Sequence, residues 1–101
     1  MPAKKPAPDI YHYCLQQLQL DAGDCLAIED SANGLLASTG AGITTLVTLN
    51  AYTVDDDFTQ AICVVDQLGE PDAPCQVIDG SPINTSYITA QSLQDLHAQA
   101  N

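Results

Sequence analysis

The sequence has very few basic residues. Two lysines, Lys4 and Lys5, oppose thirteen acidic residues, which gives a formal net charge of −11. A chain with this charge is repelled by the phosphate backbone of nucleic acid and by an anionic membrane surface, so we expect neither as a partner. Because both lysines lie near the first residue, a small bound anion must be met by one of them, by backbone amides or by a metal ion.

Long apolar runs and cysteine motifs are also missing. No apolar run approaches the roughly 20 residues of a membrane-spanning helix, and no apolar stretch of a secretory signal follows the lysines. The cysteines form no C-x-x-C pair and have no histidine at metal-ligand spacing; they are Cys14, Cys25, Cys63 and Cys75. These absences predict a cytoplasmic protein with reduced thiols.

The residues that are present predict one α/β domain with a modest core. Hydrophobic residues make up 46% of the 101 residues and charged residues only 15%, which is typical of a globular chain. The length is small for an α/β enzyme that carries both a catalytic sheet and a substrate-closing domain.

Hydrophobic periodicity places the expected helices and strands. The central strand, helix and strand are joined by short connections, which is typical of a right-handed parallel unit. The expected elements are a helix over 8–19, a strand over 25–28, a helix over 32–41, strands over 43–48 and 62–65, an extended piece over 76–80, and a helix over 90–99 capped by Thr89.

Two adjacent acids, Glu29 and Asp30, follow the strand over 25–28, which we expect to be buried on both faces. In open α/β sheets, ligands bind beyond the carboxyl ends of the strands, so acids at this place are suited to chemistry. Asp30 and Ser31 are also ordinary capping residues for the helix that follows. The stretch alone leaves a functional site and a helix cap as alternatives.

Lys5 supports the functional alternative. It precedes the first helix, and the acids follow the next strand, so a parallel unit returns them to the same edge of the sheet. Asp30 and Glu29 are hard oxygen ligands for Mg²⁺, and Lys5 would balance the charge of a transferring phosphoryl group. Since successive strand residues point to opposite faces, we expect one direct metal ligand and one acid that acts through water.

A third group of acids, in the D-x-D-x-T string over 55–59, receives a structural interpretation. A phosphoryl-accepting aspartate needs a buried strand directly before it, and these acids follow a polar loop. We expect them to lie at the positive end of a short helical stretch.

Three motifs in order resemble one known family. They are K-P-A-P-D-I-Y from Lys5, I-E-D-S-A-N-G from Ile28 and A-G-I from Ala41. Together they resemble the haloacid dehalogenase-like hydrolases of the phosphoglycolate phosphatase and β-phosphoglucomutase branch, and the stretch from Lys4 to Pro74 is most similar to CbbY-type proteins. The resemblance implies that Lys5 is the catalytic lysine, that Glu29 and Asp30 are the magnesium acids, and that the fold is part of a Rossmann-like core.

The family's first motif, D-x-D-G-T, has no counterpart in the sequence, and neither do its Ser/Thr motif and helical cap. The string over 55–59 comes too late in the order and has Phe58 where the motif has glycine. The two-step reaction of the family requires that nucleophilic carboxylate. The resemblance therefore implies the carboxyl-terminal part of a catalytic core over 1–75, lacking the amino-terminal strand, followed by an extension over 76–101.

Two functions follow from these expectations. The first is the carboxyl-terminal portion of a Mg²⁺-dependent phosphatase for a small sugar phosphate, inactive alone. For CbbY-type members the resemblance implies a substrate such as xylulose 1,5-bisphosphate, in organisms that fix carbon with Rubisco. The alternative is a non-catalytic α/β module that self-associates or binds a partner through an exposed sheet edge.

Overall fold

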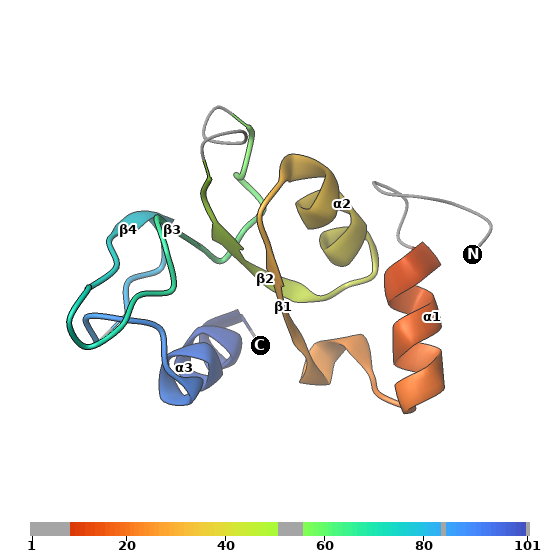
Figure 1. The fold of residues 1–101 in the computed structure, drawn as a ribbon. Coiled ribbons are helices and arrows are strands. Elements are labelled where there is room, and N and C mark those ends of the chain that lie inside the picture. Colours follow the sequence, from red (N-terminus) through yellow and green to blue (C-terminus); the bar gives the residue numbers. More distant parts are fainter. Residues whose placement is uncertain (1–8, 51–55, 84, 101) are drawn as a thin grey trace.

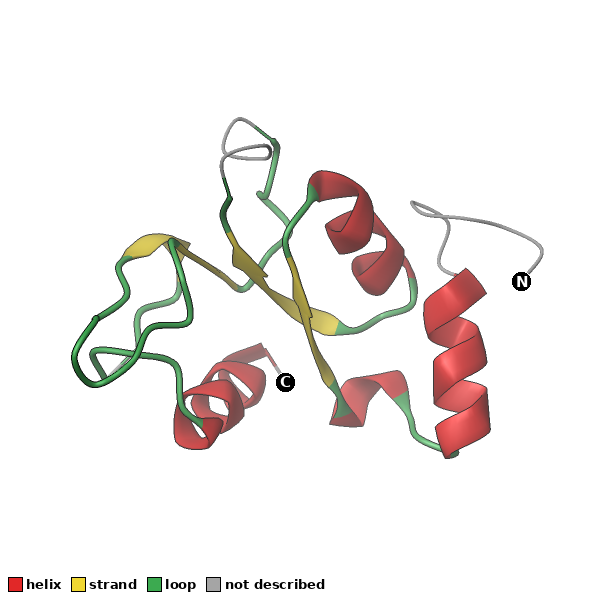
Figure 2. Cartoon of the chain, viewed as in Figure 1, coloured by secondary structure: helices red, strands yellow, loops and turns green. Residues whose placement is uncertain are grey.

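A computed structural model describes residues 9–50, 56–83 and 85–100 of the chain. Within these residues a four-stranded sheet is flanked by three α-helices (Figures 1 and 2). In chain order the elements are α1 (Asp9–Leu18), the 3-10 helix η1 (Ala22–Asp24), β1 (Leu26–Glu29), α2 (Ala32–Gly40), β2 (Thr44–Thr48), β3 (Cys63–Val65), β4 (Val77–Gly80) and α3 (Ala90–Ala100).

The strands lie in the order β1-β2-β3-β4. β1 pairs with β2 in parallel, with Leu26 opposite Thr44, and β2 pairs with β3 in parallel. β4 joins β3 in the antiparallel direction, and the register shifts between Val64 and Val65. The carboxyl ends of β1, β2 and β3 therefore point toward the same edge of the sheet.

Helices cover both faces of the sheet. Leu46 and Val47 are neighbours on β2, so their side chains point to opposite faces. Val47 packs with Leu35 of α2 in one buried cluster, and Leu46 packs with Leu96 of α3 in another. Figure 1 shows α2 and α3 on opposite sides of β1 and β2, so the molecule has three layers.

The first helix lies on the α2 side of the sheet and contacts α2. Tyr11 and Leu15, four residues apart on α1, pack against a buried cluster that contains Ala27 and Ile43. Residues at this spacing share one face of a helix. The ring of Tyr11 is thereby anchored beside β1.

Small residues and two end signals define α2. Ser31 caps its first turn, because the Ser31 hydroxyl accepts a hydrogen bond from the amide of Gly34 at 3.1 Å. Gly42 follows the helix with a φ of 81°, a left-handed conformation that glycine adopts without strain. These signals confirm the predicted helix and the Ser31 alternative for its cap.

The α/β fold class, the parallel unit and the final helix predicted from sequence are confirmed. The hydroxyl of Thr89 accepts a hydrogen bond from the amide of Ser92 at 3.0 Å, as expected of a cap for α3. The extended piece over 76–80 is a strand, paired antiparallel to β3. The division of the chain at residue 75 stays a prediction.

Two details of the sequence prediction are wrong. β1 is not buried on both faces: Ile28 is 43% exposed, because α3 packs on that face only near Leu26. The acids before Phe58 do not precede a helical stretch, since Thr59 lies in a turn.

None of the helices in the described ranges is long and apolar enough to cross a membrane.

Candidate functional site

The two adjacent acids at the end of β1 have different surroundings. Glu29 is 9% exposed and lies on the face that α1 and α2 cover, while Asp30 is exposed. Alternation along the strand explains the difference, because successive side chains point to opposite faces. The sequence places the carboxylates side by side, and the backbone sends them in different directions.

Glu29 is held between two helices. The hydroxyl of Tyr11 on α1 donates a hydrogen bond to Oε2 of Glu29. On the other side, the carboxylate lies so close to Gly34 of α2 that a Cβ at this position would collide with it. The carboxylate also lies at the positive end of the α2 dipole, which favours a negative charge.

Asp30 is connected to the neighbouring strand. Nδ2 of Asn50, two residues beyond β2, lies 3.4 Å from Oδ2 of Asp30 and 3.5 Å from its carbonyl oxygen. These are long contacts, which restrain the carboxylate without burying it. The Asp30 carboxylate is therefore exposed at the carboxyl edge of the sheet.

A third acid approaches the same corner. Oδ2 of Asp56 accepts a hydrogen bond from the amide of Ala32 at 3.1 Å, so this carboxylate satisfies an amide in the first turn of α2. Asp57 does not take part: its carboxylate accepts a hydrogen bond from the amide of Thr59 at 3.0 Å. The hydrogen bonds from Thr59 lower the pKa of the Asp57 carboxyl.

The predicted site residues can be compared with this geometry. Lys5 lies outside the described residues, so its meeting with the acids stays a prediction. Within 9–50, 56–83 and 85–100, no group of three or more His, Cys, Asp or Glu side chains is arranged to hold a metal ion. The donor chemistry of Asp30 nevertheless fits Mg²⁺, because the ion prefers carboxylate oxygen and usually keeps several waters.

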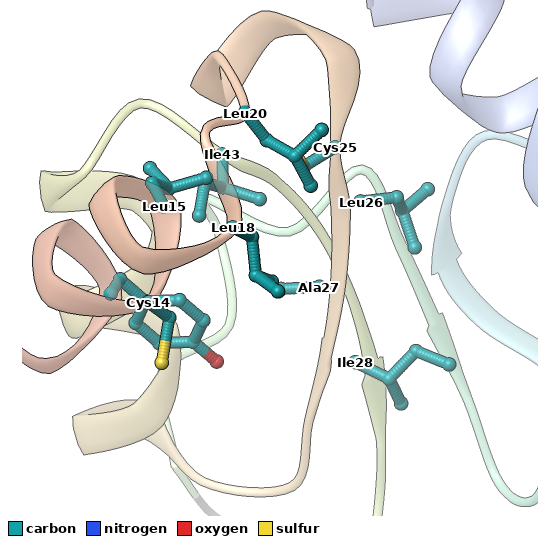
Figure 3. Close-up of a pocket in the computed structure, with 10 residues that line it drawn as sticks. Cys14, Leu15, Leu18, Leu20, Cys25, Leu26, Ala27, Ile28 and Ile43 are labelled. Carbon is teal, nitrogen blue, oxygen red and sulfur yellow. The ribbon is translucent and has the colours of Figure 1, made fainter.

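Apolar surface lies beside the acids on the same strand. A hollow of about 320 Å³ between α1 and β1 is lined by apolar and thiol side chains, among them Cys14, Leu18, Leu20, Leu26 and Ile28. Figure 3 shows side chains from both elements around it. The hollow holds none of the carboxylates, so it is a candidate contact surface and not the place of the chemistry.

Residues 1–42 match the family model of the haloacid dehalogenase-like hydrolases. The CbbY protein of Cupriavidus necator is 54% identical to this chain over 71 residues, which cover 70% of the chain and 28% of that protein. The chain belongs to the haloacid dehalogenase-like hydrolases. Within them it is CbbY-like, a group of phosphatases, and the resemblance seen in the motifs is confirmed.

Solved structures agree with this assignment. The crystal structure of CbbY from Rhodobacter sphaeroides in complex with phosphate is 39% identical and superposes with a TM-score of 0.65, over 66% of this chain and 30% of that protein. A mutant of the same protein, solved with xylulose-(1,5)bisphosphate, matches equally well. The chain thus spans less than a third of the length of these relatives. The acids of β1 lie within the residues that match the family model.

Two partners of the acids were not found from the sequence. Tyr11 shares the inner face of α1 with Leu15, and a tyrosine hydroxyl on such a face needs a polar partner, which points to the acids at the end of the next strand. Asn50 follows the second strand, and parallel strands end at one edge, so its position beside Asp30 was open to prediction. The contact between Gly34 and Glu29 could not be predicted from the sequence, because it depends on how α2 packs against β1.

Proposed function

We propose that this chain provides the magnesium-binding part of a CbbY-like phosphatase site and becomes active when a region that carries the D-x-D-G-T nucleophile is supplied. The observation that supports the proposal is Asp30: an exposed carboxylate at the carboxyl end of β1, in contact with Asn50, within the residues that match the family model. Ligands of open α/β sheets bind at this place.

In this proposal Asp30 holds the ion directly and Glu29 acts through water. The bound Mg²⁺ would neutralise charge on the phosphoryl oxygens of the substrate. In this proposal Glu29, which is buried and accepts a hydrogen bond from Tyr11, orients a metal-bound water and does not contact the ion. Lys5, one of only two lysines in this acidic chain, would supply positive charge to the site.

The proposed substrate is a small sugar bisphosphate such as xylulose 1,5-bisphosphate. The support comes from the CbbY relative that was crystallised with this compound. We also propose the cytoplasm as the location, because all four cysteines are free thiols, as a reducing compartment favours.

Complementation tests the main proposal. Phosphate release from a generic phosphomonoester and from xylulose 1,5-bisphosphate is measured with Mg²⁺, for the chain alone and mixed with the amino-terminal half of a CbbY relative. We expect activity only in the mixture, loss of it with Asp30→Asn, and no loss with Asp72→Asn, a control at an exposed loop acid. Activity of the chain alone, or indifference to Asp30→Asn, contradicts the proposal.

The exposed edge of the sheet favours a second candidate function, the docking of a strand from another chain. β1 is an edge strand of the described sheet, and it lies beside the apolar hollow of Figure 3. Leu18 is 67% exposed and Leu20 is 48% exposed at its rim. An unpaired strand beside apolar surface recruits other chains.

Light scattering separates the two candidates. A partner-binding module captures a CbbY amino-terminal half, or a second copy, without gaining phosphatase activity. The net charge of −11 opposes the approach of two copies, so a dimer should form only at high salt, where this repulsion is screened. A complex that forms together with Asp30-dependent activity favours the first candidate.

A further inference from the structure

We propose that Tyr11 is a positioning residue of the metal site: its hydroxyl fixes the carboxylate of Glu29 in the orientation that the site requires. The inference rests on the proposed magnesium site and goes beyond it, because Tyr11 lies on α1 and is not one of the predicted ligands. The hydrogen bond from the Tyr11 hydroxyl to Oε2 of Glu29 is the contact that carries it.

Burial makes this contact consequential. Glu29 is 9% exposed, and a buried carboxylate needs hydrogen-bond partners to compensate for lost water. A hydroxyl that donates to an ionised carboxylate forms one of the stronger hydrogen bonds found in proteins. The partner supplied by Tyr11 therefore fixes the direction of the Glu29 carboxylate.

The two helices locate both oxygens of the carboxylate. Tyr11 holds Oε2, while Oε1 lies against Gly34, where a side chain would occupy the same space. Each oxygen accepts more than one hydrogen bond, so a carboxylate held in this way can still accept from a metal-bound water. Its position is set before any ligand arrives.

The ring of Tyr11 is fixed independently of its hydroxyl. It packs with Leu15 against the cluster of Ala27, Ala41 and Ile43, and it borders a hollow of about 240 Å³ together with Glu29. A phenylalanine at this position keeps the packing and loses only the donor. The structural and the positioning contributions of Tyr11 can therefore be measured separately.

The first measurement tests the contact without metal. The chain contains no tryptophan and four tyrosines, so its fluorescence reports on tyrosine alone. A carboxylate bound to a phenol hydroxyl quenches the emission. We expect Glu29→Gln to raise the emission of the chain and to leave the emission of the Tyr11→Phe variant unchanged. An equal rise in both backgrounds overturns the proposal.

The second measurement tests positioning with Mn²⁺ as the probe, read by the electron paramagnetic resonance signal of the free ion. We expect Tyr11→Phe to weaken Mn²⁺ binding about tenfold, the lower end of the loss that is typical when a group supporting a metal site from outside the ligand set is removed. Tyr13→Phe is the matched control, because Tyr13 lies on the same helix and is 51% exposed. It should bind Mn²⁺ as the unmodified chain does.

The outcomes distinguish the two proposals. Mn²⁺ binding that Asp30→Asn removes and Tyr11→Phe leaves unchanged overturns the role of Tyr11 alone. Mn²⁺ binding that does not depend on Asp30, or no binding at all, overturns the proposed site and with it the role of Tyr11. A tenfold loss in Tyr11→Phe, with thermal unfolding matched to that of Tyr13→Phe, supports positioning over a purely structural role.

Discussion

The unit β1–α2–β2 and the carboxyl-terminal segment of β4 and α3 belong to the same sheet but are built differently. In the first, parallel strands and a capped helix bring polar groups to one corner, where the carboxylates of Glu29, Asp30 and Asp56 contact the Tyr11 hydroxyl, the Asn50 side chain and the Ala32 amide, respectively. In the second, β4 is exposed along its length and α3 contributes Leu96 to an apolar cluster. We therefore expect the stability of the first unit to depend on the positions of its polar groups. The stability of the second should depend on the apolar area that it buries.

The largest expected effect tests the second region. Leu96 is fully buried between α3 and the sheet, so Leu96→Ala should lower the free energy of unfolding by about 2–5 kcal/mol through lost burial and a residual cavity. Urea unfolding followed by circular dichroism gives the value. Leu36→Ala, on an exposed position of α2, is the control with an expected change below about 0.5 kcal/mol.

If α3 does not contribute to the stability of the sheet, the expectation that the second region depends on buried area is contradicted. Leu96→Ala would then release α3 while β1 and β2 keep their amide protection, and hydrogen exchange would show two separate transitions. We expect one transition, because Leu96 packs against Leu46 in the middle of the sheet.

Gly34→Ala tests the first region, because we expect this glycine-to-alanine change in a helix to lower stability and not to raise it. Alanine in a helix is normally more stable than glycine by about 1 kcal/mol. Here the added Cβ meets the Glu29 carboxylate, which must leave its place and lose the Tyr11 hydrogen bond, so we expect a net destabilisation of about 1–2 kcal/mol. Thermal unfolding measures the difference.

Gly23→Ala is the matched control for this prediction. A Cβ at Gly23 meets nothing within 4 Å, so the change should stay within about 0.5 kcal/mol. A stabilising Gly34→Ala would show that Glu29 moves without penalty, and the two regions would then not differ in their dependence on polar geometry.

Ser31→Ala removes the cap of α2 and should cost about 1 kcal/mol. The control is Asp21→Ala at the start of η1, where the side chain makes no capping hydrogen bond. Chemical denaturation of the two variants in parallel gives the comparison, and equal effects would mean that the Ser31 hydroxyl contributes nothing to the corner.

The smallest expected effect is on the stability of the fold at low pH. The pKa of Asp57 is lowered from 3.8 by the hydrogen bonds of Thr59, so the folded state binds this proton less readily than the unfolded state. The resulting stability is fully present above about pH 4 and is lost as the pH falls through the lowered pKa. Asp57→Asn should flatten this part of the stability curve, measured by thermal unfolding from pH 5 to pH 2.

The predictable part of the fold is the part where local signals agree with packing. Apolar periodicity located α1 and α2, and β-branched residues located β2, because burial of these residues is what forms the elements. The exposure of Ile28 was not predictable, since it depends on how far α3 extends along the sheet. The sequence pattern of an edge strand and of a central strand is the same over four residues.

The candidate site was predictable in its acids and not in their partners. The position of Glu29 and Asp30 after a strand is a local feature, and family motifs reinforced it. The donors Tyr11 and Asn50 lie eighteen and twenty residues away in the chain from Glu29 and Asp30, respectively, and only the three-dimensional arrangement selects them. The direction of each carboxylate follows from strand alternation, which the sequence already indicated.

The register shift in β3 has a consequence for the opposite side of the sheet. β4 is four residues long, it is displaced by the irregularity at Val64 and Val65, and it carries Asp79 at the rim. Short length, a bulge and a charge are the features that discourage further strands from pairing. In the described sheet, a further strand can therefore pair with β1 more readily than with β4. We expect a chain that extends the sheet to add beside β1.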